Sequence, residues 1–372
     1  MQQNDPVSVL IAPLNWGLGH ATRCIPIIKE LVNQGSGVII AAVGNQKKLL
    51  EAEFPHLEFI EIPGREMRYK RGFFLKWSLI FSIPGILRQI RDENTWLDNI
   101  LRDHKIDAVI SDNRYGLFHK DCFCVFITHQ LYIQSGSKPF RVFDKWIDGR
   151  LLKWNYKRIS KFSCCWVPDM ERGFSLAGIL SHPAGKPPVP TEYIGILSRF
   201  QYQELTPVKN SLLILLSGPE PQRTRFENIL FGELAGVSLE TIVVRGLPET
   251  GKPVPFIGEG IKIYNHLGSE DLNKLIIQSE WIIARSGYST VMDLVKLKRT
   301  AVLVPTPGQT EQEYLGRYLH EKKWMYSVPQ KNFNLEKTLR AFQKIKLEIP
   351  EMPDSPLETV VKDFLDKISL QR

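Results

Sequence analysis

The stretch IIARSGYSTVMDLVKLKRTAVLVPTPGQTEQEYLGRYL, residues 282–319, contains two strand-to-helix passages in succession. A short apolar run ends at the turn RSG (285–287), and apolar residues at helical spacing follow over 289–296. A second apolar run, 301–304, leads through a polar turn into another helical pattern at 311–320. Because consecutive strands of a parallel sheet end at the same edge, both polar turns are expected to lie together.

The same alternation continues on both sides of this stretch. Short, continuous apolar runs predict strands that are covered on both faces. They occur at residues 7–12, 38–43, 59–62, 108–110, 124–127 and 164–167, and again at 212–216, 241–244, 261–264 and 281–284. Helical spacing follows several of them, as at residues 24–31, from 224 onward, and at 271–278. We therefore predict an α/β protein that uses one parallel-sheet architecture twice.

A change in composition divides the chain. Residues 181–190 are rich in proline and glycine, and a polar stretch follows that ends near Asn210. Such segments are typical of domain boundaries. We predict a Rossmann-like domain over residues 1–200, a second one over 208–350, and a C-terminal helix within 351–372 that packs back on the first domain.

The composition excludes several protein classes. The chain has 372 residues, 43% of them hydrophobic and 24% charged, with a net charge of +8. These values are those of a globular protein and exclude disordered, collagen-like and coiled-coil chains. The first apolar run is interpreted as a strand and not as a signal peptide, and residues 77–87 are too short to span a membrane. Five cysteines without a CxxC pair indicate reduced thiols, so we expect a cytoplasmic protein.

The first strand and the first helix are joined by the turn NWGLGH, residues 15–20. Gly17 and Gly19 allow the backbone to approach a ligand, and the helix N-terminus behind them favours negative charge. His20 is placed to act as a neutral base. The alternatives are a purely structural tight turn and a histidine that serves helix capping or packing.

A second polar turn, Asp112-Asn113-Arg114-Tyr115, follows the strand at 108–110 and is expected at the same sheet edge. Asp112 is a second candidate base, or the group that orients His20. An ordinary Asx-turn is the alternative reading.

In the second domain the Ser-Gly turn and the free N–H groups of the following helix suit a phosphate or a nucleoside. Asp293, on the first turns of that helix, could accept hydrogen bonds from a ribose diol. Its alternative role is to stabilise the helix dipole.

These turns resemble those of glycosyltransferase family 28. In that family an Arg-Ser-Gly turn precedes a helix with a ribose-binding acid, and a proline-led segment with a glutamine follows. The turn at 285–287 matches, Asp293 stands where the family usually has Glu, and Gln312 matches a sugar-contacting Gln. The resemblance is strongest over residues 261–320. It implies an α/β protein of the GT-B fold, with two Rossmann-like domains facing each other across a cleft.

The resemblance also implies roles for other residues. Gly17-Leu18-Gly19-His20 resemble the family's N-terminal Gly-Gly-His turn, and Arg199 matches an arginine near the diphosphate. The expected donor-binding residues are Gly17, Gly19, Arg199, Ser217, Gly218, Arg223, His266, Leu267, Arg285, Ser286, Gly287, Tyr288, Ser289, Thr290, Asp293, Gln309, Thr310, Glu311 and Gln312. The expected acceptor-binding residues are Arg114, Tyr115 and His129.

Two segments depart from the family pattern. Ser217-Gly218-Pro219-Glu220 replaces a Gly-Gly-Ser-Gln phosphate turn, which leaves open which N–H groups hold the phosphates. Thr128-His129-Gln130 stands where the family's peptidoglycan enzyme has an acidic acceptor motif. The fold and the class of donor therefore carry over better than the acceptor.

The resemblance implies an inverting glycosyltransferase that takes a sugar from UDP-GlcNAc or a related UDP-hexose to a hydroxyl acceptor, with His20 or Asp112 as the base. We expect no metal and no cofactor, because no histidine spacing, HExxH or CxxC indicates a metal site. The alternatives are a UDP-sugar epimerase of the same architecture and a non-catalytic protein that binds an anionic ligand. No nucleic-acid motif is present.

Residues 65–91, REMRYKRGFFLKWSLIFSIPGILRQIR, combine basic and aromatic side chains. This composition fits a patch at a lipid headgroup surface, so we expect an anionic membrane surface as a partner and a lipid-linked or glycan acceptor. An amphipathic helix with solvated lysines is the alternative. Pro84 is expected to limit any single helix to one side of it.

Overall fold

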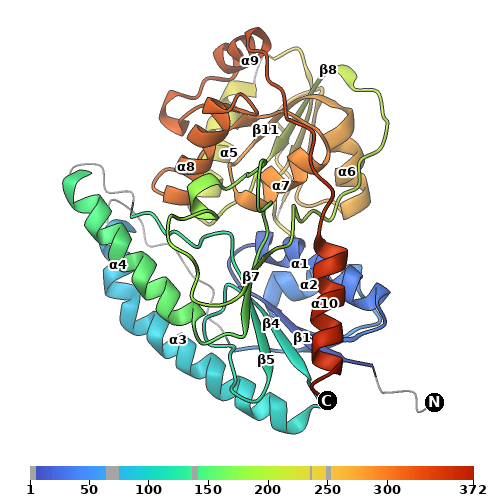
Figure 1. The fold of residues 1–372 in the computed structure, drawn as a ribbon. Helices are drawn as coiled ribbons and strands as arrows, with labels where there is room; N and C mark the ends of the chain where they lie inside the picture. The colour runs from blue at the N-terminus through green and yellow to red at the C-terminus, as the bar shows by residue number, and fades with distance from the viewer. Residues whose placement is uncertain (1–5, 64–74, 136–140, 235–236, 249–252) are drawn as a thin grey trace. The chain divides into compact units, whose positions relative to one another are not determined.

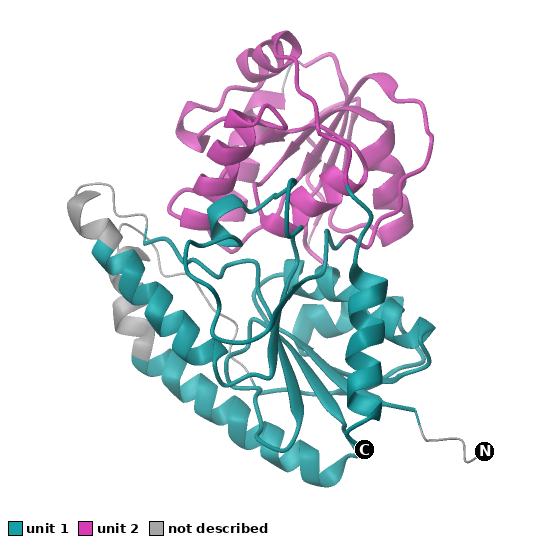
Figure 2. Ribbon diagram, in the orientation of Figure 1, with its two compact units in different colours: residues 1–67, 72–197, 353–372 teal, residues 68–71, 198–352 magenta. Residues whose placement is uncertain are grey.

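The computed structural model describes the chain except residues 1–5, 64–74, 136–140, 235–236 and 249–252. It forms two compact units (Figure 2). The described part of the first comprises residues up to 197 together with 353–372, and that of the second lies within 198–352.

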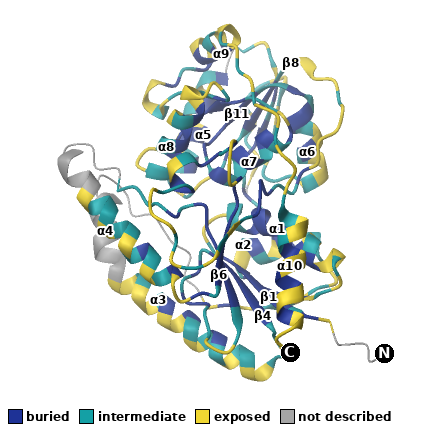
Figure 3. Ribbon diagram, in the orientation of Figure 1, coloured by how far each residue is buried: buried dark blue, intermediate teal, exposed yellow. Residues whose placement is uncertain are grey.

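The first unit contains a parallel sheet of seven strands in the order β3-β2-β1-β4-β5-β6-β7 (Figure 1). The strands are β1 (Ser8–Pro13), β2 (Gly37–Ala41), β3 (Glu58–Ile60), β4 (Ala108–Asp112), β5 (Phe123–Ile127), β6 (Cys164–Val167) and β7 (Thr191–Tyr193). The helices are α1 (Gly19–Asn33), α2 (Gly44–Glu53), α3 (Leu75–Asp103), α4 (Arg141–Ile159) and α10 (Leu357–Ser369). The central strands are buried almost throughout (Figure 3), which is why they read as continuous apolar runs.

The strand order reverses between β1 and β4, the two central strands that lead in opposite directions across the sheet. Pro13, the last residue of β1, lies opposite Asp112, the last residue of β4. The turn after β1 and the turn after β4 therefore leave the sheet side by side. In open α/β sheets this switch point is where ligands bind.

The C-terminal helix α10 belongs to the first unit. The ring of Phe364 packs 5.8 Å from that of Phe123 and 5.3 Å from that of Trp166, measured between centroids. The approach of the preceding segment depends on Gly195, which has a φ of +77°. A Cβ there would lie 2.7 Å from the hydroxyl of Ser355, so a larger residue would displace the segment.

The second unit contains a parallel sheet of six strands in the order β10-β9-β8-β11-β12-β13. The strands are β8 (Val208–Leu215), β9 (Glu240–Val244), β10 (Ile261–Tyr264), β11 (Ser279–Ala284), β12 (Val302–Leu303) and β13 (Tyr326–Ser327). The helices are α5 (Gln222–Leu234), α6 (Ser269–Gln278), α7 (Tyr288–Lys296), α8 (Thr310–Glu321) and α9 (Leu335–Lys344). Here the order reverses between β8 and β11, so the turn after β11 lies at a second switch point.

Some elements differ from the sequence expectations. The helices α4 and α9 and the short edge strands β7 and β13 were not predicted. The helix α9 does show the pattern, since Leu335, Leu339 and Phe342 recur at helical spacing and are buried. The expectation that Pro84 limits a helix is wrong, since α3 continues through it. Pro84 is exposed, so water can hydrogen-bond to the carbonyl that loses its helical partner. Among the described helices none is both long and apolar enough to cross a membrane.

Candidate functional site

The turn between β1 and α1 places the N-terminus of α1 at the first switch point. Gly17 has a φ of +72°, which favours glycine, and Gly19 is the first residue of the helix. The buried side chain of Gln46 donates to the carbonyls of Leu14 at 2.7 Å and Gly17 at 2.6 Å. The turn is thus held from the side, and no side chain caps the helix N-terminus.

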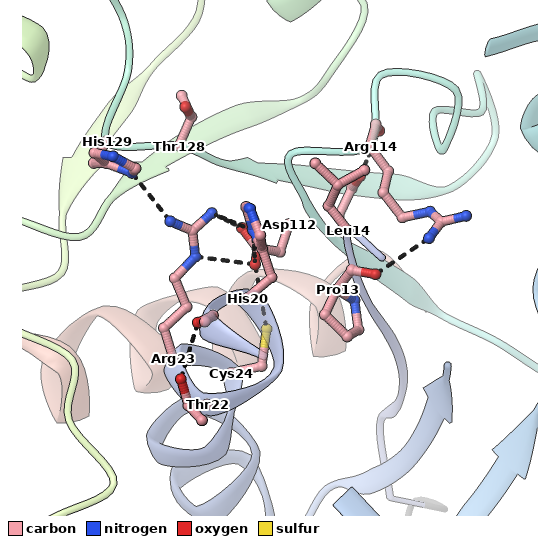
Figure 4. Close-up of polar contacts among 12 residues, drawn as sticks. Pro13, Leu14, His20, Thr22, Arg23, Cys24, Asp112, Arg114, Thr128 and His129 are labelled. Atoms are coloured by element: carbon pink, nitrogen blue, oxygen red, sulfur yellow. Dashed lines mark hydrogen bonds and ion pairs between the residues drawn. The ribbon is translucent and has the colours of Figure 1, made fainter. Parts of the chain in front are cut away.

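His20 and Asp112 meet at this point, as the sequence suggested (Figure 4). The Nδ1 atom of His20 lies 2.9 Å from an oxygen of Asp112, and the His20 side chain is 15% exposed. No hydrogen bond from His20 Nε2 to another described residue is present. With Nδ1–H donated to the carboxylate, Nε2 carries the lone pair that can accept a proton.

A third residue, Arg23, completes the cluster and was not singled out from the sequence. Its Nε donates to Asp112 Oδ2 at 3.0 Å and its Nη2 to Asp112 Oδ1, while Nη1 lies 3.0 Å from His129 Nδ1. The spacing of His20 and Arg23, three residues apart on one helix face, is the signal that could have found it. His129 is therefore part of the same hydrogen-bond network. The sequence analysis expected it to bind the acceptor.

The charges around His20 and Asp112 shift their pKa values and so favour different roles for the two candidate bases. Burial raises the pKa of Asp112, but the Arg23 cation and His20 outweigh it and lower this pKa to about 2. Burial and the Arg23 cation lower the pKa of His20 below 6.5, although Asp112 opposes them. At neutral pH the carboxylate is ionised and the imidazole neutral, so His20 fits a base and Asp112 the group that orients it.

The side chains of Arg114 and Tyr115 form no hydrogen bond with this cluster, so their expected acceptor-binding role finds no support in these contacts. Asn113 has a φ of +58°, and the turn carries the side chains that follow it into the interior. Arg114 is buried, pairs with Glu93 at 3.2 Å and donates to the carbonyl of Pro13, pointing away from His20 (Figure 4). The ring of Tyr115 stacks on Phe126, and its hydroxyl donates to Oδ1 of Asn155 on α4.

In the second unit three helix N-termini lie at strand ends without a side-chain cap. They are those of α6, α7 and α8, with Gly268, Gly287 and Gln309 at the N-cap positions. Their first N–H groups are suited to phosphate oxygens. The expected donor residues Gly287, Tyr288, Ser289, Thr290, Gln309, Thr310 and Glu311 lie at the start of α7 and α8, although the side chain of Tyr288 is buried.

The second group of expected donor residues surrounds Asp293 on α7. The hydroxyl of Ser198 donates to Asp293 Oδ1 at 2.6 Å, and Arg199 donates to Ser269 at 3.1 Å. Burial raises the pKa of Asp293 to about 6, although Arg199 and the Ser198 hydrogen bond oppose the rise. Burial and the Arg199 cation lower the pKa of His266, which precedes α6 next to Leu267. Sequence reasoning did not single out Ser198 and Ser269.

The side chain of Arg285 is held inside the second unit, so its contacts lend no support to its expected place among the donor-binding residues. It is fully buried and donates to the carbonyls of Val304 at 3.0 Å and Gln222 at 3.1 Å. Its guanidinium lies 4.2 Å from the centre of the Phe226 ring. The guanidinium therefore links the turn after β12 to the start of α5 through hydrogen bonds. Arginine can do this because its side chain is long and its guanidinium carries five N–H donors.

Arg223 is also paired within the second unit, so its expected contact with the diphosphate finds no support in these contacts. It pairs with Glu220 at 2.7 Å and with the buried Glu227 at 3.1 Å. Ser217 and Gly218 remain at the end of β8, where Gly218 has a φ of +99°.

Ser286 and Gln312 join the two strand-to-helix turns of residues 282–319. The Ser286 hydroxyl donates to the carbonyl of Gln312 at 2.8 Å, and Gln312 Oε1 accepts from the N–H of Thr306 at 2.9 Å. These hydrogen bonds connect the turn after β11 with the turn after β12. In the described part of the chain no three His, Cys, Asp or Glu side chains gather as a metal ion would need.

Comparisons with known proteins agree with this architecture. Residues 261–368 match the glycosyltransferase family 28 C-terminal domain. An uncharacterized glycosyltransferase of Methanosarcina acetivorans is 24% identical over 335 residues, which cover 87% of each chain. The structure of MurG from Acinetobacter baumannii matches with a TM-score of 0.52 and 14% identity over 98% of this chain and 95% of that one.

A structure from Arabidopsis thaliana, complexed with UDP-L-rhamnose, matches with a TM-score of 0.59 and 11% identity over 99% of this chain and 95% of that one. These neighbours have the GT-B fold. The chain is a GT-B glycosyltransferase that resembles family 28. In this glycosyltransferase the turns that hold His20 and Asp112 lie at the carboxyl ends of the strands of the first sheet. The turns that precede α7 and α8 lie at the carboxyl ends of the strands of the second sheet.

Proposed function

We propose that this glycosyltransferase is an inverting enzyme that uses a UDP-hexose as its donor and a hydroxyl group as its acceptor. The observation that carries the proposal is the His20–Asp112 pair at the switch point of the first unit, with one ring nitrogen left for a substrate. The finer assignment, UDP-GlcNAc or a related hexose, rests on the resemblance to family 28.

In the proposed reaction His20 Nε2 takes the proton of the acceptor hydroxyl as its oxygen attacks the anomeric carbon. A new carbon–oxygen bond forms while the bond from that carbon to the diphosphate breaks, and the electron pair leaves with UDP. A single displacement inverts the anomeric configuration. Asp112 stays ionised and stabilises the imidazolium that forms.

On the donor side the second unit supplies the complementary charges. The uncapped N-termini of α6, α7 and α8 and the guanidinium of Arg199 would meet the charge that develops on the diphosphate. Asp293 would accept hydrogen bonds from the ribose hydroxyls through its second oxygen, since Ser198 already donates to the first.

A panel of nucleotide sugars tests the donor assignment. We expect UDP and UDP-hexoses to raise the Tm and the corresponding GDP compounds to leave it unchanged, because only ligands that bind the native state stabilise it. With acceptor present, NMR of the product should show the inverted anomeric configuration. No Tm shift with any nucleotide sugar, or UDP release with epimerised sugar and no acceptor, would overturn this proposal.

The acceptor is proposed to be lipid-linked or a glycan and to be met at an anionic membrane surface. Residues 65–74 of the segment that suggested this, including Phe73 and Phe74, lie outside the described residues, and the side chains of residues 75–83 are not described either. The described part of α4 supports the proposal from another place. Trp146 is 61% exposed, the Arg150 guanidinium lies 4.8 Å from its ring centre, and Lys153 is exposed one turn further. Aromatic and basic side chains of this kind favour headgroup surfaces.

Flotation with anionic vesicles tests membrane binding. We expect the wild-type protein to float at low salt and to dissociate at high salt, since each basic residue near the surface contributes about 1 kcal/mol. Phe73→Ser with Trp77→Ser, and separately Trp146→Ser, should weaken flotation. Phe256→Ser is the matched control, because Phe256 is 84% exposed in the second unit. Absence of wild-type flotation at low salt would favour a soluble acceptor.

A further inference from the structure

Arg23 is a buried charged side chain of the first unit with several polar partners. It lies on α1 one turn after His20, and its side chain is 2% exposed. Its fork spans both oxygens of Asp112, through Nε and Nη2, and its remaining nitrogen Nη1 contacts Nδ1 of His129. A bidentate pair of this kind fixes the plane of a carboxylate as well as its position.

The same guanidinium also lies next to the candidate base. Arg23 Nη2 is 2.9 Å from His20 Nδ1, and Asp112 Oδ2 is 2.9 Å from the same atom. Nδ1 has either one proton or one lone pair, so it cannot donate to the carboxylate and accept from the guanidinium at once. In the tautomer that leaves Nε2 as a base, Nδ1–H donates to Asp112 and the Arg23 contact is a contact of charge. A carboxylate held in this plane keeps the histidine in the tautomer whose Nε2 is a base.

We propose that Arg23 is a positioning residue for glycosyl transfer, whose guanidinium fixes the Asp112 carboxylate against His20. The inference rests on the proposed role of His20 as the base. Arg23 acts through Asp112 and does not need to contact either substrate. An arginine is required because a lysine has neither the planar fork nor the reach to both Asp112 and His129.

The groups that face His20 make the direction of the effect unambiguous. They are Arg23 from α1, Asp112 from the end of β4, and His129 from the turn after β5. Cys24 of α1 contacts Asp112, and burial raises the pKa of its thiol, so it stays uncharged. Without the Arg23 charge the carboxylate acts on His20 alone, and the pKa of His20 rises.

Two variants separate the charge of Arg23 from its geometry. In Arg23→Gln we expect the acid limb of the kcat/KM profile to move to higher pH by about one unit. In Arg23→Lys the limb should stay near its wild-type position, while kcat falls by up to about 100-fold because the carboxylate is no longer clamped. The KM for the donor should change little in both. A fall in kcat with unchanged pH profiles in both variants would indicate a merely structural role and overturn the inference.

A double-mutant comparison tests whether Arg23 acts through Asp112. In an Asp112→Asn background the carboxylate is absent, so Arg23→Gln should reduce kcat little further. This double variant leaves no unpaired buried charge, so its kcat can be measured even where Arg23→Gln alone folds poorly. Multiplicative losses of kcat in the double variant would contradict action through Asp112.

An NMR titration of the His20 imidazole separates this inference from the proposed function. We expect the His20 pKa to lie below 6.5 in the wild type and to rise in Arg23→Gln. If the pKa moves as expected but no sugar is transferred to any acceptor, the proposed function fails and the role of Arg23 stands. If transfer is observed but the His20 pKa is the same in both proteins, the inference about Arg23 is overturned.

Discussion

Replacing His20 by alanine is expected to reduce kcat by roughly 10²- to 10⁴-fold, which is the usual contribution of a positioned general base. The affinity for UDP should not change, because His20 lies in the first unit and the expected donor residues around Asp293 lie in the second. Single-turnover kinetics together with calorimetric titration of UDP measure the two effects separately.

The matched control is His104→Ala. His104 belongs to the same unit, is 33% exposed and pairs only weakly with Glu58 at 3.6 Å, so its removal should leave kcat unchanged. In the wild type, kcat/KM should fall as the pH drops through the His20 pKa, below 6.5, because the imidazolium cannot accept a proton. Wild-type turnover in His20→Ala would mean that His20 is structural and that Asp112 is the base.

Removing the carboxylate of Asp293 is expected to produce the second large effect, a loss of nucleotide affinity. In Asp293→Ala the Kd for UDP should rise about 10- to 150-fold, which corresponds to roughly 1.5–3 kcal/mol for a hydrogen bond to a charged group. The Kd for pyrophosphate should change far less, because the carboxylate is proposed to bind the ribose.

The isosteric variant Asp293→Asn tests the environment of this carboxyl group through stability. Its pKa is raised from 3.8 to about 6 in the native state, so the native state holds the proton to a higher pH than the unfolded chain does. The free energy of unfolding of the wild type therefore decreases between pH 4 and pH 6 through this group, by at most about 3 kcal/mol. Asp293→Asn lacks this decrease. Its free energy of unfolding, compared with that of the wild type at the same pH, should therefore be more favourable at pH 7 than at pH 4.

An exposed carboxyl group provides the contrast. Asp271 lies in the first turn of α6, where a negative charge stabilises the helix, so Asp271→Asn should slightly destabilise the protein at pH 7. If Asp293→Asn behaves like Asp271→Asn and UDP binding is unchanged, Asp293 serves only the helix dipole. In that case its assignment from the family pattern is wrong.

Much of the fold could be predicted because local patterns and burial agree in it. The strands β1 and β6 and the helices α7 and α8 have continuous apolar runs or clear helical spacing, and their bounds match the expectations to within one or two residues. The helix α4 could not be found in this way, since its apolar residues show little preference for one face. A long helix of this kind is stabilised by packing against its unit more than by its own pattern.

The positions of the candidate site residues could be predicted as far as the ends of the strands could be predicted. His20, Asp112 and Asp293 each follow an apolar run closely. Within each sheet, parallel topology brings such turns to the same edge of that sheet. Side-chain direction was not predictable from the same rule. Arg114, Arg223 and Arg285 also follow strand ends, but each is bound to interior carboxylates or carbonyls, because a buried guanidinium must find partners for its donors.

The sequence by itself therefore determined the α/β class, the strand-end position of the candidate groups and the resemblance to family 28, because these depend on residue type and spacing along the chain. Only the tertiary structure shows which arginines are bound to interior groups and which candidate fits the proposed base better. Asp112 and Arg23 are 89 residues apart in sequence, and their contact holds the carboxylate ionised and leaves His20 as the group that can accept a proton. Such a contact depends on how β4 and α1 pack, and electrostatic effects depend on distance in space and not on separation along the chain.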